Sequence, residues 1–280
     1  QYPRGDGGDQ KLMKLACLPM YDLDPVRDAT DAWWDGLARA CRAESFSDVP
    51  DELWRGGTRE DFWRAPDLLL SQTCGYPLLK HFMAHLTLLA TPIYGADGCY
   101  GANYCSLIVV HAESKAETLE DLRGGICAIN DWDSQSGMNV LRHTLAPLAH
   151  DGRFFAGVKV AGKHQLSVAM IKRGEADVAA IDCVTHGLMS RHDPDSVAGT
   201  HVLAQTQAAP ALPYVTAKHT NQTDRARLRA ALNRALEDPD LADARDALMI
   251  KGFADPTLAD YKIMLEMEAG AAAAGYPVLQ

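Results

Sequence analysis

Short apolar runs alternate with amphipathic segments along most of this chain. The run at 106–111 (Ser-Leu-Ile-Val-Val-His) and the run at 126–129 (Ile-Cys-Ala-Ile) are rich in β-branched residues, which is typical of buried strands. Between such runs, apolar residues recur at spacings of three and four, which predicts helices with one apolar face. Strands that alternate with helices predict an α/β protein with mainly parallel sheets.

The pattern gives approximate bounds for each element. We expect strands at 15–18, 66–72, 86–91, 106–111, 126–129, 158–160, 178–181 and 201–204. We expect helices that begin near Pro25 and at 118–122, 138–148, 164–173, 223–236, 241–250 and 258–269.

Two stretches, 104–112 and 203–210, have the character of crossings between two lobes. If both are hinges, the chain between them forms an inserted lobe. The predicted division is lobe 1 at 13–106 plus 208–280, lobe 2 at 107–207, and a tag or disordered leader at 1–12.

A serine-rich turn, Asp133-Ser134-Gln135-Ser136-Gly137, follows the run at 126–129 and precedes a helical pattern. Unpaired backbone N–H groups and the positive end of the helix dipole face outward at such a point. They form a site for an anion such as phosphate, phosphonate or carboxylate. Ordinary N-capping by Ser134 or Ser136 is the alternative interpretation, and the local pattern leaves both open.

The amino-acid composition and net charge limit the classes of partner that we expect. The chain has 280 residues, 47% of them hydrophobic and 23% charged, with a formal net charge of −10. Nucleic acid is therefore not an expected partner, because it requires a basic face. A small anion is still compatible, since a local group of N–H donors acts at contact distance. No run approaches the roughly 20 apolar residues of a membrane span.

The seven cysteines include no CxxC motif and no Cys/His pair at zinc spacing. We therefore predict no metal and no cofactor. A disulfide from Cys99 to Cys74 or Cys105 is one expectation, and reduced, partly buried thiols are the other. The chain also lacks GxSxG and GxxxxGK[ST], so we predict a binding protein rather than an enzyme.

Four segments, in their order and spacing, resemble the phosphate/phosphite/phosphonate-type solute-binding proteins of ABC transporters. They are Leu70-Ser71-Gln72-Thr73-Cys74-Gly75-Tyr76-Pro77, Ser134-Gln135-Ser136-Gly137, Gly162-Lys163-His164 and Asp177-Val178-Ala179-Ala180-Ile181-Asp182. The resemblance covers about 15–230. It implies a type II periplasmic-binding-protein fold, in which two lobes joined by two hinge crossovers close on a ligand.

The resemblance also implies roles for individual residues. The serine-rich turn would hold phosphonate oxygens through Ser134 and Ser136, while Gln135 stands where threonine is common. His164 would lie in the ligand cleft, and Asp182 would face a ligand amine. The full set of predicted ligand-binding residues is Tyr21, Gln72, Thr73, Tyr104, Trp132, Ser134, Gln135, Ser136, Gly137, His164 and Asp182.

Structural roles compete with these assignments. His164 suits a helix cap or a surface position, and Asp182 suits an N-cap for the turn that reaches Thr185. Trp132 could stack on a ligand or pack in the core.

The sequence thus predicts a solute-binding receptor of an ABC transporter that captures a small anionic, phosphonate- or phosphate-like molecule between two closing lobes. We expect a periplasmic monomer whose protein partner is the transporter permease; if Met13 is the true start, we expect a cytoplasmic protein. The alternatives are an enzyme of cofactor-precursor biosynthesis on the same fold and a cytoplasmic ligand-sensing domain.

Overall fold

The structure is a computed structural model that describes residues 14–280. The predicted tag or leader at 1–12 lies outside the described residues. The chain forms two compact units. Unit 1 holds the described residues up to Thr73 together with Lys80–Pro92 and Leu212–Pro256, and unit 2 holds Cys74–Leu79, Ile93–Ala211 and Thr257–Gln280. The chain passes between these units several times, and 257–280 groups with unit 2. The division into lobes at the bounds expected from the sequence stays a prediction.

Unit 1 is built on a five-stranded sheet with the order β1-β2-β11-β3-β12. β1 pairs in parallel with β2, whereas β11 runs antiparallel to both β2 and β3. The strands are β1 (Leu15–Cys17), β2 (Leu68–Gln72), β3 (Leu86–Tyr94), β11 (Tyr214–Ala217) and β12 (Ile250–Ala254).

The helices of unit 1 bury apolar residues against this sheet. Trp33 on α1 stacks on the ring of Phe253 at 6.4 Å between centroids, and its indole N–H donates to the Tyr214 hydroxyl at 3.1 Å. The helical segments that lie wholly in this unit are η1 (Asp24–Val26), α1 (Arg27–Ala43), α2 (Arg59–Trp63), α8 (Gln222–Glu237), η6 (Pro239–Leu241) and α9 (Ala242–Ala247), while η2 (Leu78–Phe82) spans the boundary with unit 2.

Unit 2 contains a second five-stranded sheet with the order β7-β6-β8-β5-β9. β6 is parallel to β7 and β8, whereas β5 is antiparallel to β8 and β9. Both sheets are thus mixed, where the alternation predicted mainly parallel pairing; a strand such as β5, which follows another strand and not a crossover helix, can pair in either direction. The strands are β4 (Asn103–Tyr104), β5 (Ser106–His111), β6 (Ile126–Ile129), β7 (Gly157–Val160), β8 (Val178–Asp182), β9 (Thr200–Gln205) and β10 (Ala209–Pro210).

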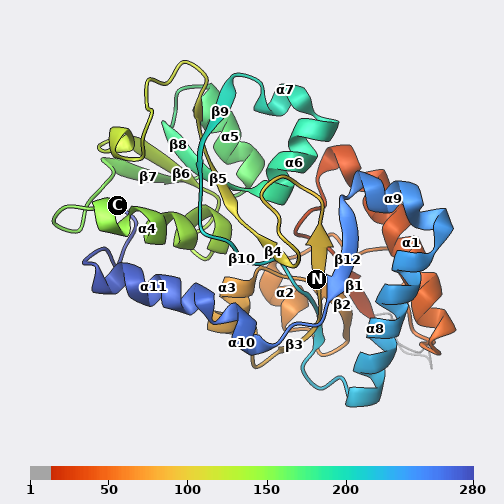
Figure 1. Ribbon diagram of the computed structural model, residues 1–280. Helices are drawn as coiled ribbons and strands as arrows, with labels where there is room; N and C mark the ends of the chain where they lie inside the picture. The colour runs from red at the N-terminus through yellow and green to blue at the C-terminus, as the bar shows by residue number, and fades with distance from the viewer. Residues whose placement is uncertain (1–13) are drawn as a thin grey trace. The chain divides into compact units, whose positions relative to one another are not determined.

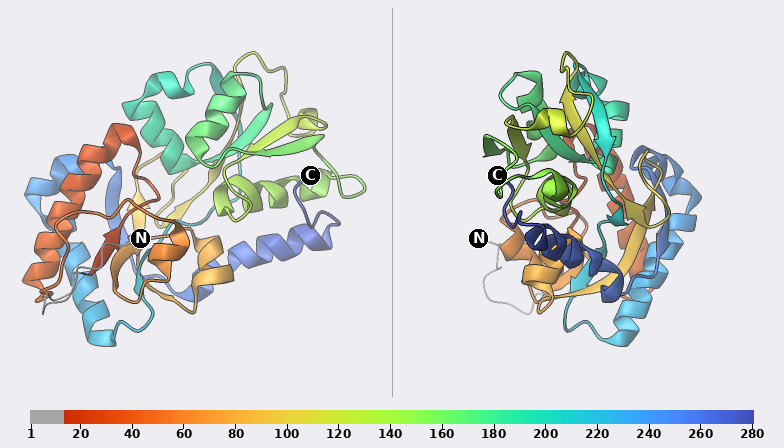
Figure 2. Two further views of the ribbon diagram at one scale, coloured as in Figure 1. Left: turned by 180° about the vertical axis from the view of Figure 1, so that it is seen from behind. Right: turned by 60° about the vertical axis from the view of Figure 1, so that its left-hand side comes forward.

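Helices of unit 2 pack on this sheet and on one another. α5 packs against the central strands, and α4 lies alongside α11 (Figures 1 and 2). The helical segments are α3 (Gly75–Pro77), η3 (Glu120–Leu122), η4 (Gln135–Asn139), α4 (Val140–Leu145), η5 (Ala146–Leu148), α5 (His164–Lys172), α6 (Cys183–His192), α7 (Pro194–Val197), α10 (Leu258–Tyr261) and α11 (Ile263–Ala273).

Buried hydrogen bonds explain why the C-terminal segment belongs to unit 2. The Asn139 amide donates to the carbonyl of Met264 at 2.8 Å, and the Arg142 guanidinium donates to the carbonyl of Pro277 at 2.8 Å. Hydrophobic periodicity carries no signal for such side-chain to backbone bonds.

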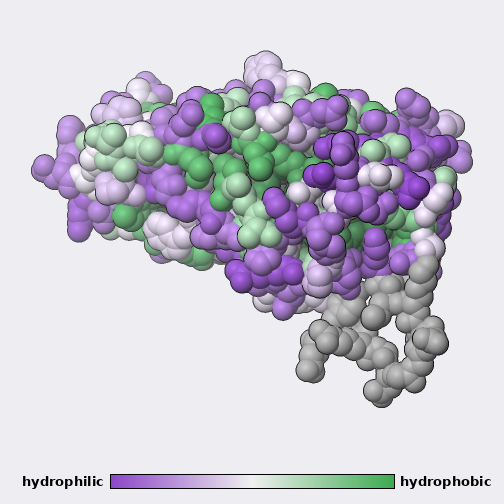
Figure 3. Space-filling view, turned by 90° about the horizontal axis from the view of Figure 1, so that it is seen from below, coloured by the Kyte–Doolittle hydropathy of each residue, from purple (hydrophilic) through white to green (hydrophobic). Residues whose placement is uncertain are grey.

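The surface of the described residues carries large apolar side chains at a few positions. Exposed ones are Met83, Tyr100, Trp132, Val160, Leu166, Val202 and Val278. Figure 3 shows one face on which hydrophilic residues predominate and hydrophobic residues gather near the middle. Within 14–280, no helix has both the length and the apolar character needed to cross a membrane.

Candidate functional site

The serine-rich turn forms where β6 gives way to a helical segment that runs without interruption from η4 through α4 to η5. Ser134 is the N-cap of η4, a π-helical turn, and its Oγ accepts a hydrogen bond from the Gly137 amide at 3.0 Å. The capping interpretation of Ser134 is therefore confirmed. π-Helical turns of this kind are frequent at functional sites.

Gly137 permits a close approach between this turn and the end of β6. A Cβ at position 137 would overlap Oδ1 of Asn130, which is buried and lacks a hydrogen-bond partner among the described residues. The turn therefore requires glycine here for packing, and not for a positive φ.

Ser136 links the turn to α5. Its Oγ lies 2.9 Å from Nε2 of His164, the first residue of α5, and 3.4 Å from Oγ of Ser134. Nδ1 of His164 is buried and has no partner within the described chain. Burial lowers the pKa of His164 from 6.5 to about 4, so the imidazole is neutral at neutral pH.

Counting hydrogens in this cluster shows what it can donate. Ser134, Ser136 and neutral His164 each carry one polar side-chain hydrogen, so the three groups hold three. Their two mutual contacts use at most two of these hydrogens, and the contact at 3.4 Å is long for a hydroxyl pair. One hydrogen of the cluster is therefore not used in these two contacts, and the Tyr104 hydroxyl, which interacts with Ser136, is a further acceptor for it.

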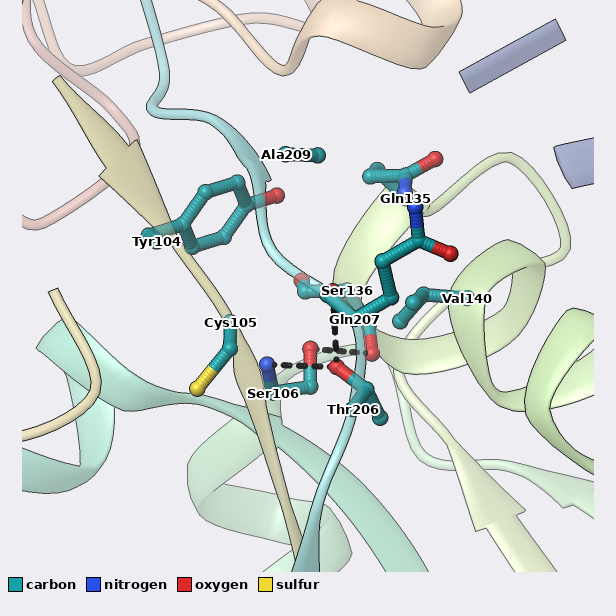
Figure 4. Close-up of a pocket in the computed structure, with 9 residues that line it drawn as sticks. All are labelled: Tyr104, Cys105, Ser106, Gln135, Ser136, Val140, Thr206, Gln207 and Ala209. Atoms are coloured by element: carbon teal, nitrogen blue, oxygen red, sulfur yellow. Dashed lines mark hydrogen bonds between the residues drawn. The ribbon is translucent and has the colours of Figure 1, made fainter. Parts of the chain in front are cut away.

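Two neighbouring segments fix the backbone of Ser136. The hydroxyl of Ser106 donates to the Ser136 carbonyl at 2.9 Å, and the Ser106 amide donates to Oγ1 of Thr206 at 2.9 Å (Figure 4). A small pocket with about 140 Å³ of empty space, part of it open to solvent, lies here. It is lined by Tyr104, Cys105, Ser106, Gln135, Ser136, Val140, Thr206, Gln207 and Ala209. The lining side chains leave no room for a water molecule between them, so a solute group can enter only if they move apart.

Tyr104 provides a second unused donor. Its side chain is 2% exposed, and its hydroxyl donates to no acceptor among the described residues, although the Ser136 side chain interacts with it and opposes the rise of its pKa. Figure 4 shows the hydroxyl on the side of the turn that carries Gln135 and Ser136. Burial raises the pKa of Tyr104 well above 10, so the group is a protonated hydroxyl at neutral pH. A buried donor without an acceptor is unfavourable until a ligand supplies one.

Asp182 has the structural role that the alternative interpretation gave it. Its Oδ1 accepts from the amides of Val184 at 2.8 Å and Thr185 at 3.0 Å, so it caps α6. Its charge also contributes to the raised pKa of Tyr104, after burial and Cys74. The Asp182 carboxylate therefore contributes to the raised pKa of Tyr104 and at the same time caps α6.

Cys74 belongs to this cluster, although it is not among the ligand-binding residues predicted from the sequence. Burial raises the pKa of its thiol to about 11, and hydrogen bonds from the amides of Gln135 and Tyr76 oppose that rise. The amide of Gln135, at the start of the helical segment, thus faces a polarisable thiol. The sequence signal was present, because Cys74 lies inside the segment 70–77 that carries the family resemblance.

The polar atoms of the Gln135 side chain contact other protein groups, which a threonine hydroxyl at this position would not reach in the same way. Its Oε1 accepts from the Asn139 amide at 2.7 Å, and its Nε2 lies 3.2 Å from Sδ of Met267. This side chain therefore bonds to η4 and α11, and its backbone amide bonds to the Cys74 thiol. The predicted contact of Gln135 with ligand stays a prediction.

The remaining predicted residues fall in other surroundings. Trp132 is 46% exposed, which excludes core packing and leaves ligand stacking as a prediction. Tyr21, Gln72 and Thr73 are buried in unit 1. There the Gln72 amide donates to the Leu212 carbonyl at 2.9 Å, and the Thr73 amide donates to the Pro213 carbonyl at 3.1 Å. Their contact with ligand stays a prediction.

A model of the family described as "ABC transporter, phosphonate, periplasmic substrate-binding protein" matches residues 66–261, more than half of the chain. The chain belongs to this family. The role of this phosphonate-type substrate-binding protein is that of a solute-binding receptor. The matched range includes the serine-rich turn, Tyr104, His164 and Asp182. No curated protein shows a significant sequence match to the chain.

Solved structures share the fold of this phosphonate-type binding protein at low sequence identity. A binding protein component of an ABC phosphonate transporter from Pseudomonas aeruginosa is 13% identical, with a TM-score of 0.75, and the match covers 95% of this chain and 88% of that one. PhnD1 from Prochlorococcus marinus, in complex with methylphosphonate, is 15% identical with a TM-score of 0.74 over 92% and 97%. A Xanthomonas citri protein bound to ATP is 17% identical with a TM-score of 0.69 over 93% and 97%. The two-lobe type II periplasmic-binding-protein fold is thereby confirmed.

Proposed function

We propose that this receptor binds a small phosphonate- or phosphate-like oxyanion at the turn formed by Ser134–Gly137. The observation that carries the proposal is the buried hydroxyl of Tyr104, which has no acceptor among the described residues. The Ser134–Ser136–His164 cluster adds two hydroxyls and an imidazole that can donate to the same ligand. An oxyanion supplies several acceptors to donors placed this way, and each charge-assisted bond contributes about 1.5–3 kcal/mol.

The donors at the pocket are neutral, and this affects which class of ligand the site favours. The residues that line the pocket include no charged side chain, while the carboxylate of Asp182 lies near enough to affect Tyr104. A purely anionic ligand would be repelled by this carboxylate. A ligand with an amine beside its oxyanion would be attracted to it, so we propose an aminoalkylphosphonate-like solute in preference to inorganic phosphate.

The same geometry favours binding over catalysis. Ser136 and His164 form a nucleophile–base pair in outline, but a base with a pKa of about 4 removes protons poorly at neutral pH. A serine hydrolase also needs a third group that orients the imidazole, whereas Nδ1 of His164 has no partner within 14–280. These features support a receptor that releases its solute unchanged.

The family description supports a proposal for the partners and the compartment. We propose that the receptor works as a periplasmic monomer and delivers its solute to an ABC transporter permease. The family description, which names a periplasmic protein of an ABC transporter, supports this proposal. The net charge of −10 supports the absence of nucleic acid among its partners.

Calorimetric titration of the full chain tests the proposal. The probes are an aminoalkylphosphonate, methylphosphonate, inorganic phosphate and, as a tetrahedral oxyanion without phosphorus, sulfate. We expect saturable binding that is tightest for the aminoalkylphosphonate and weakest for sulfate. Phosphorus NMR of the same mixtures should show each phosphorus compound unchanged after a long incubation. Equal weak heats for all four anions would overturn the site, and consumption of a probe would overturn the receptor role.

A further inference from the structure

Three of the seven cysteines gather in unit 2, although they come from distant parts of the sequence. Sγ of Cys99 lies 3.5 Å from Sγ of Cys183, 84 positions later. Cys105 is the third member, since a side-chain hydrogen bond between Cys105 and Cys183 contributes to the pKa of each thiol. The sequence predicted Cys74 or Cys105 as a partner of Cys99, whereas the recorded sulfur contact of Cys99 is with Cys183.

The backbone around these thiols is arranged for close approach. Cys183 begins α6, directly after Asp182, and Cys105 joins β4 to β5. Cys99 lies in the preceding loop, where Gly98 has a φ of +95°. A Cβ at position 98 would lie 2.8 Å from Sγ of Cys105 and 3.1 Å from Cβ of Cys183. Glycine therefore allows this loop to reach the other two cysteines.

Metal binding does not account for the cluster. Among the described residues, no group of three or more His, Cys, Asp or Glu side chains has a geometry that could hold a metal ion. The sulfur atoms of Cys99 and Cys183 are instead 3.5 Å apart, and a disulfide bond is about 2.05 Å long. A small rotation of the side chains covers most of this difference.

We propose that Cys99 and Cys183 are a disulfide-forming pair that fastens the loop around Cys99 to the start of α6, beside Asp182. Cys99 is partly exposed, whereas Cys183 is 1% exposed, so an external disulfide reacts first at Cys99. The family is described as periplasmic, and the bacterial periplasm is an oxidising compartment. This pairing is independent of the proposed ligand.

The reaction balances with one small-molecule disulfide as the oxidant. The Cys99 sulfur attacks the oxidant, which breaks its S–S bond, forms a mixed disulfide and releases one thiol that carries the Cys99 proton. The Cys183 sulfur then attacks the Cys99 sulfur, which releases the second thiol with the Cys183 proton. Two protein thiols are oxidised to one disulfide, and one oxidant disulfide is reduced to two thiols.

Mass spectrometry of the full chain tests the pairing. Reduced protein and protein incubated with glutathione disulfide are alkylated under denaturing conditions without reduction. The chain has seven cysteines, so we expect seven alkylations before oxidation and five afterwards. Cleavage by trypsin at Arg173 and Arg191 isolates Cys183, and cleavage by chymotrypsin at Tyr94, Tyr100 and Tyr104 separates Cys99 from Cys105. The cross-linked peptides should then contain Cys99 and Cys183.

Variants distinguish the pairing from alternatives within the cluster. Cys105→Ala should still form the bond, and Cys99→Ala should lose it. Cys127→Ala is the matched control, because Cys127 is buried and its recorded hydrogen bond goes to a backbone carbonyl instead of another thiol. It should form the bond as the wild type does. The oxidised protein should unfold at a temperature at least about 4 °C higher than the reduced protein. Seven alkylations after oxidation, or a cross-link from Cys99 to Cys105, would overturn the proposal.

Discussion

The Ser136 hydroxyl lies 2.9 Å from Nε2 of His164 and joins the helical segment after β6 to the first residue of α5. Each of these residues begins or lies near the start of a helix, where backbone N–H groups are unpaired. The pair therefore combines a hydroxyl and a neutral imidazole at one point.

Removal of the Ser136 hydroxyl should weaken solute binding at least tenfold. The change Ser136→Ala removes one of the three polar hydrogens of the cluster, and the lost bond to a charged oxygen contributes about 1.5–3 kcal/mol. Calorimetry with the aminoalkylphosphonate measures the effect. Ser190→Ala is the matched control, since Ser190 is an exposed serine on α6 of the same unit. It should bind as the wild type does, and equal affinity for Ser136→Ala would exclude the hydroxyl from the site.

The Tyr104 hydroxyl should matter for binding and not for folding. In Tyr104→Phe the buried, unpartnered O–H disappears, so the free energy of unfolding should stay the same or rise by about 1 kcal/mol. Solute affinity should nevertheless fall about tenfold. Chemical denaturation and calorimetry on the same preparation separate the two effects.

Tyr276→Phe is the contrasting variant, because it should change stability and not affinity. The Tyr276 hydroxyl donates to the carbonyl of Gln280 at 2.8 Å, so its removal should lower stability by about 1 kcal/mol and leave affinity unchanged. If Tyr104→Phe behaves in the same way, the Tyr104 hydroxyl is structural and the proposed site loses its main support.

Sequence reasoning placed the regular elements of the sheets well because buried strands carry a direct signal. The runs at 106–111 and 126–129 coincide with β5 and β6, and His164 begins α5 as expected. The helix predicted at 241–250 is shorter, because Ile250 begins β12 and α9 ends at Ala247. Five residues of apolar pattern do not distinguish a helix end from a strand start.

The candidate site was only partly predictable. The spacing of Ser134, Gly137 and the following apolar stripe identifies a capped helix start, and the resemblance adds His164. The orientation of Gln135 could not be predicted, because it depends on Asn139 and on Met267, more than 100 residues away. The gathering of Cys99, Cys105 and Cys183 is likewise a property of the fold.

His164 should make the protein less stable in mild acid. Its folded pKa of about 4 lies below the ordinary value of 6.5, so between these values the unfolded chain binds a proton that the folded chain does not. Its contribution to stability is fully present above about pH 6.5 and is lost as the pH falls to 4. Between pH 7.5 and pH 5 the loss should be about 2 kcal/mol.

Urea unfolding of the wild type and His164→Gln at pH 7.5 and pH 5 measures this loss. The variant should lose about 2 kcal/mol less than the wild type over the same interval. His201→Gln, at an exposed position on β9, is the matched control and should follow the wild type. Parallel losses for His164→Gln and the wild type would mean that His164 titrates in the folded protein as it does in the unfolded chain.

A side chain at position 137 should disturb the turn. In Gly137→Ala the new Cβ meets Oδ1 of Asn130, so either the turn or the end of β6 must shift. We expect a loss of about 1–3 kcal/mol in the free energy of unfolding and weaker solute binding. Gly270→Ala on the exposed face of α11 is the control, because its Cβ would lie 3.6 Å from His143 and alanine favours a helix. Thermal unfolding should show a lower midpoint for the first variant and an equal or higher one for the second.

The network around Asn139 should stabilise unit 2 through its C-terminal helix. The Asn139 amide donates to Gln135 and to the Met264 carbonyl, and its Oδ1 accepts from Arg142 at 2.7 Å. In Asn139→Ala these buried partners lose their bonds at once, and the buried Arg142 guanidinium keeps only its bond to the Pro277 carbonyl, so we expect a loss of about 3–5 kcal/mol. Asn233→Ala, on the exposed face of α8, should change stability by less than about 1 kcal/mol. Hydrogen exchange should show faster exchange in both α4 and α11 of Asn139→Ala. Faster exchange in α4 alone would mean that α11 is held by its apolar contacts and that the Asn139 bonds contribute little to it.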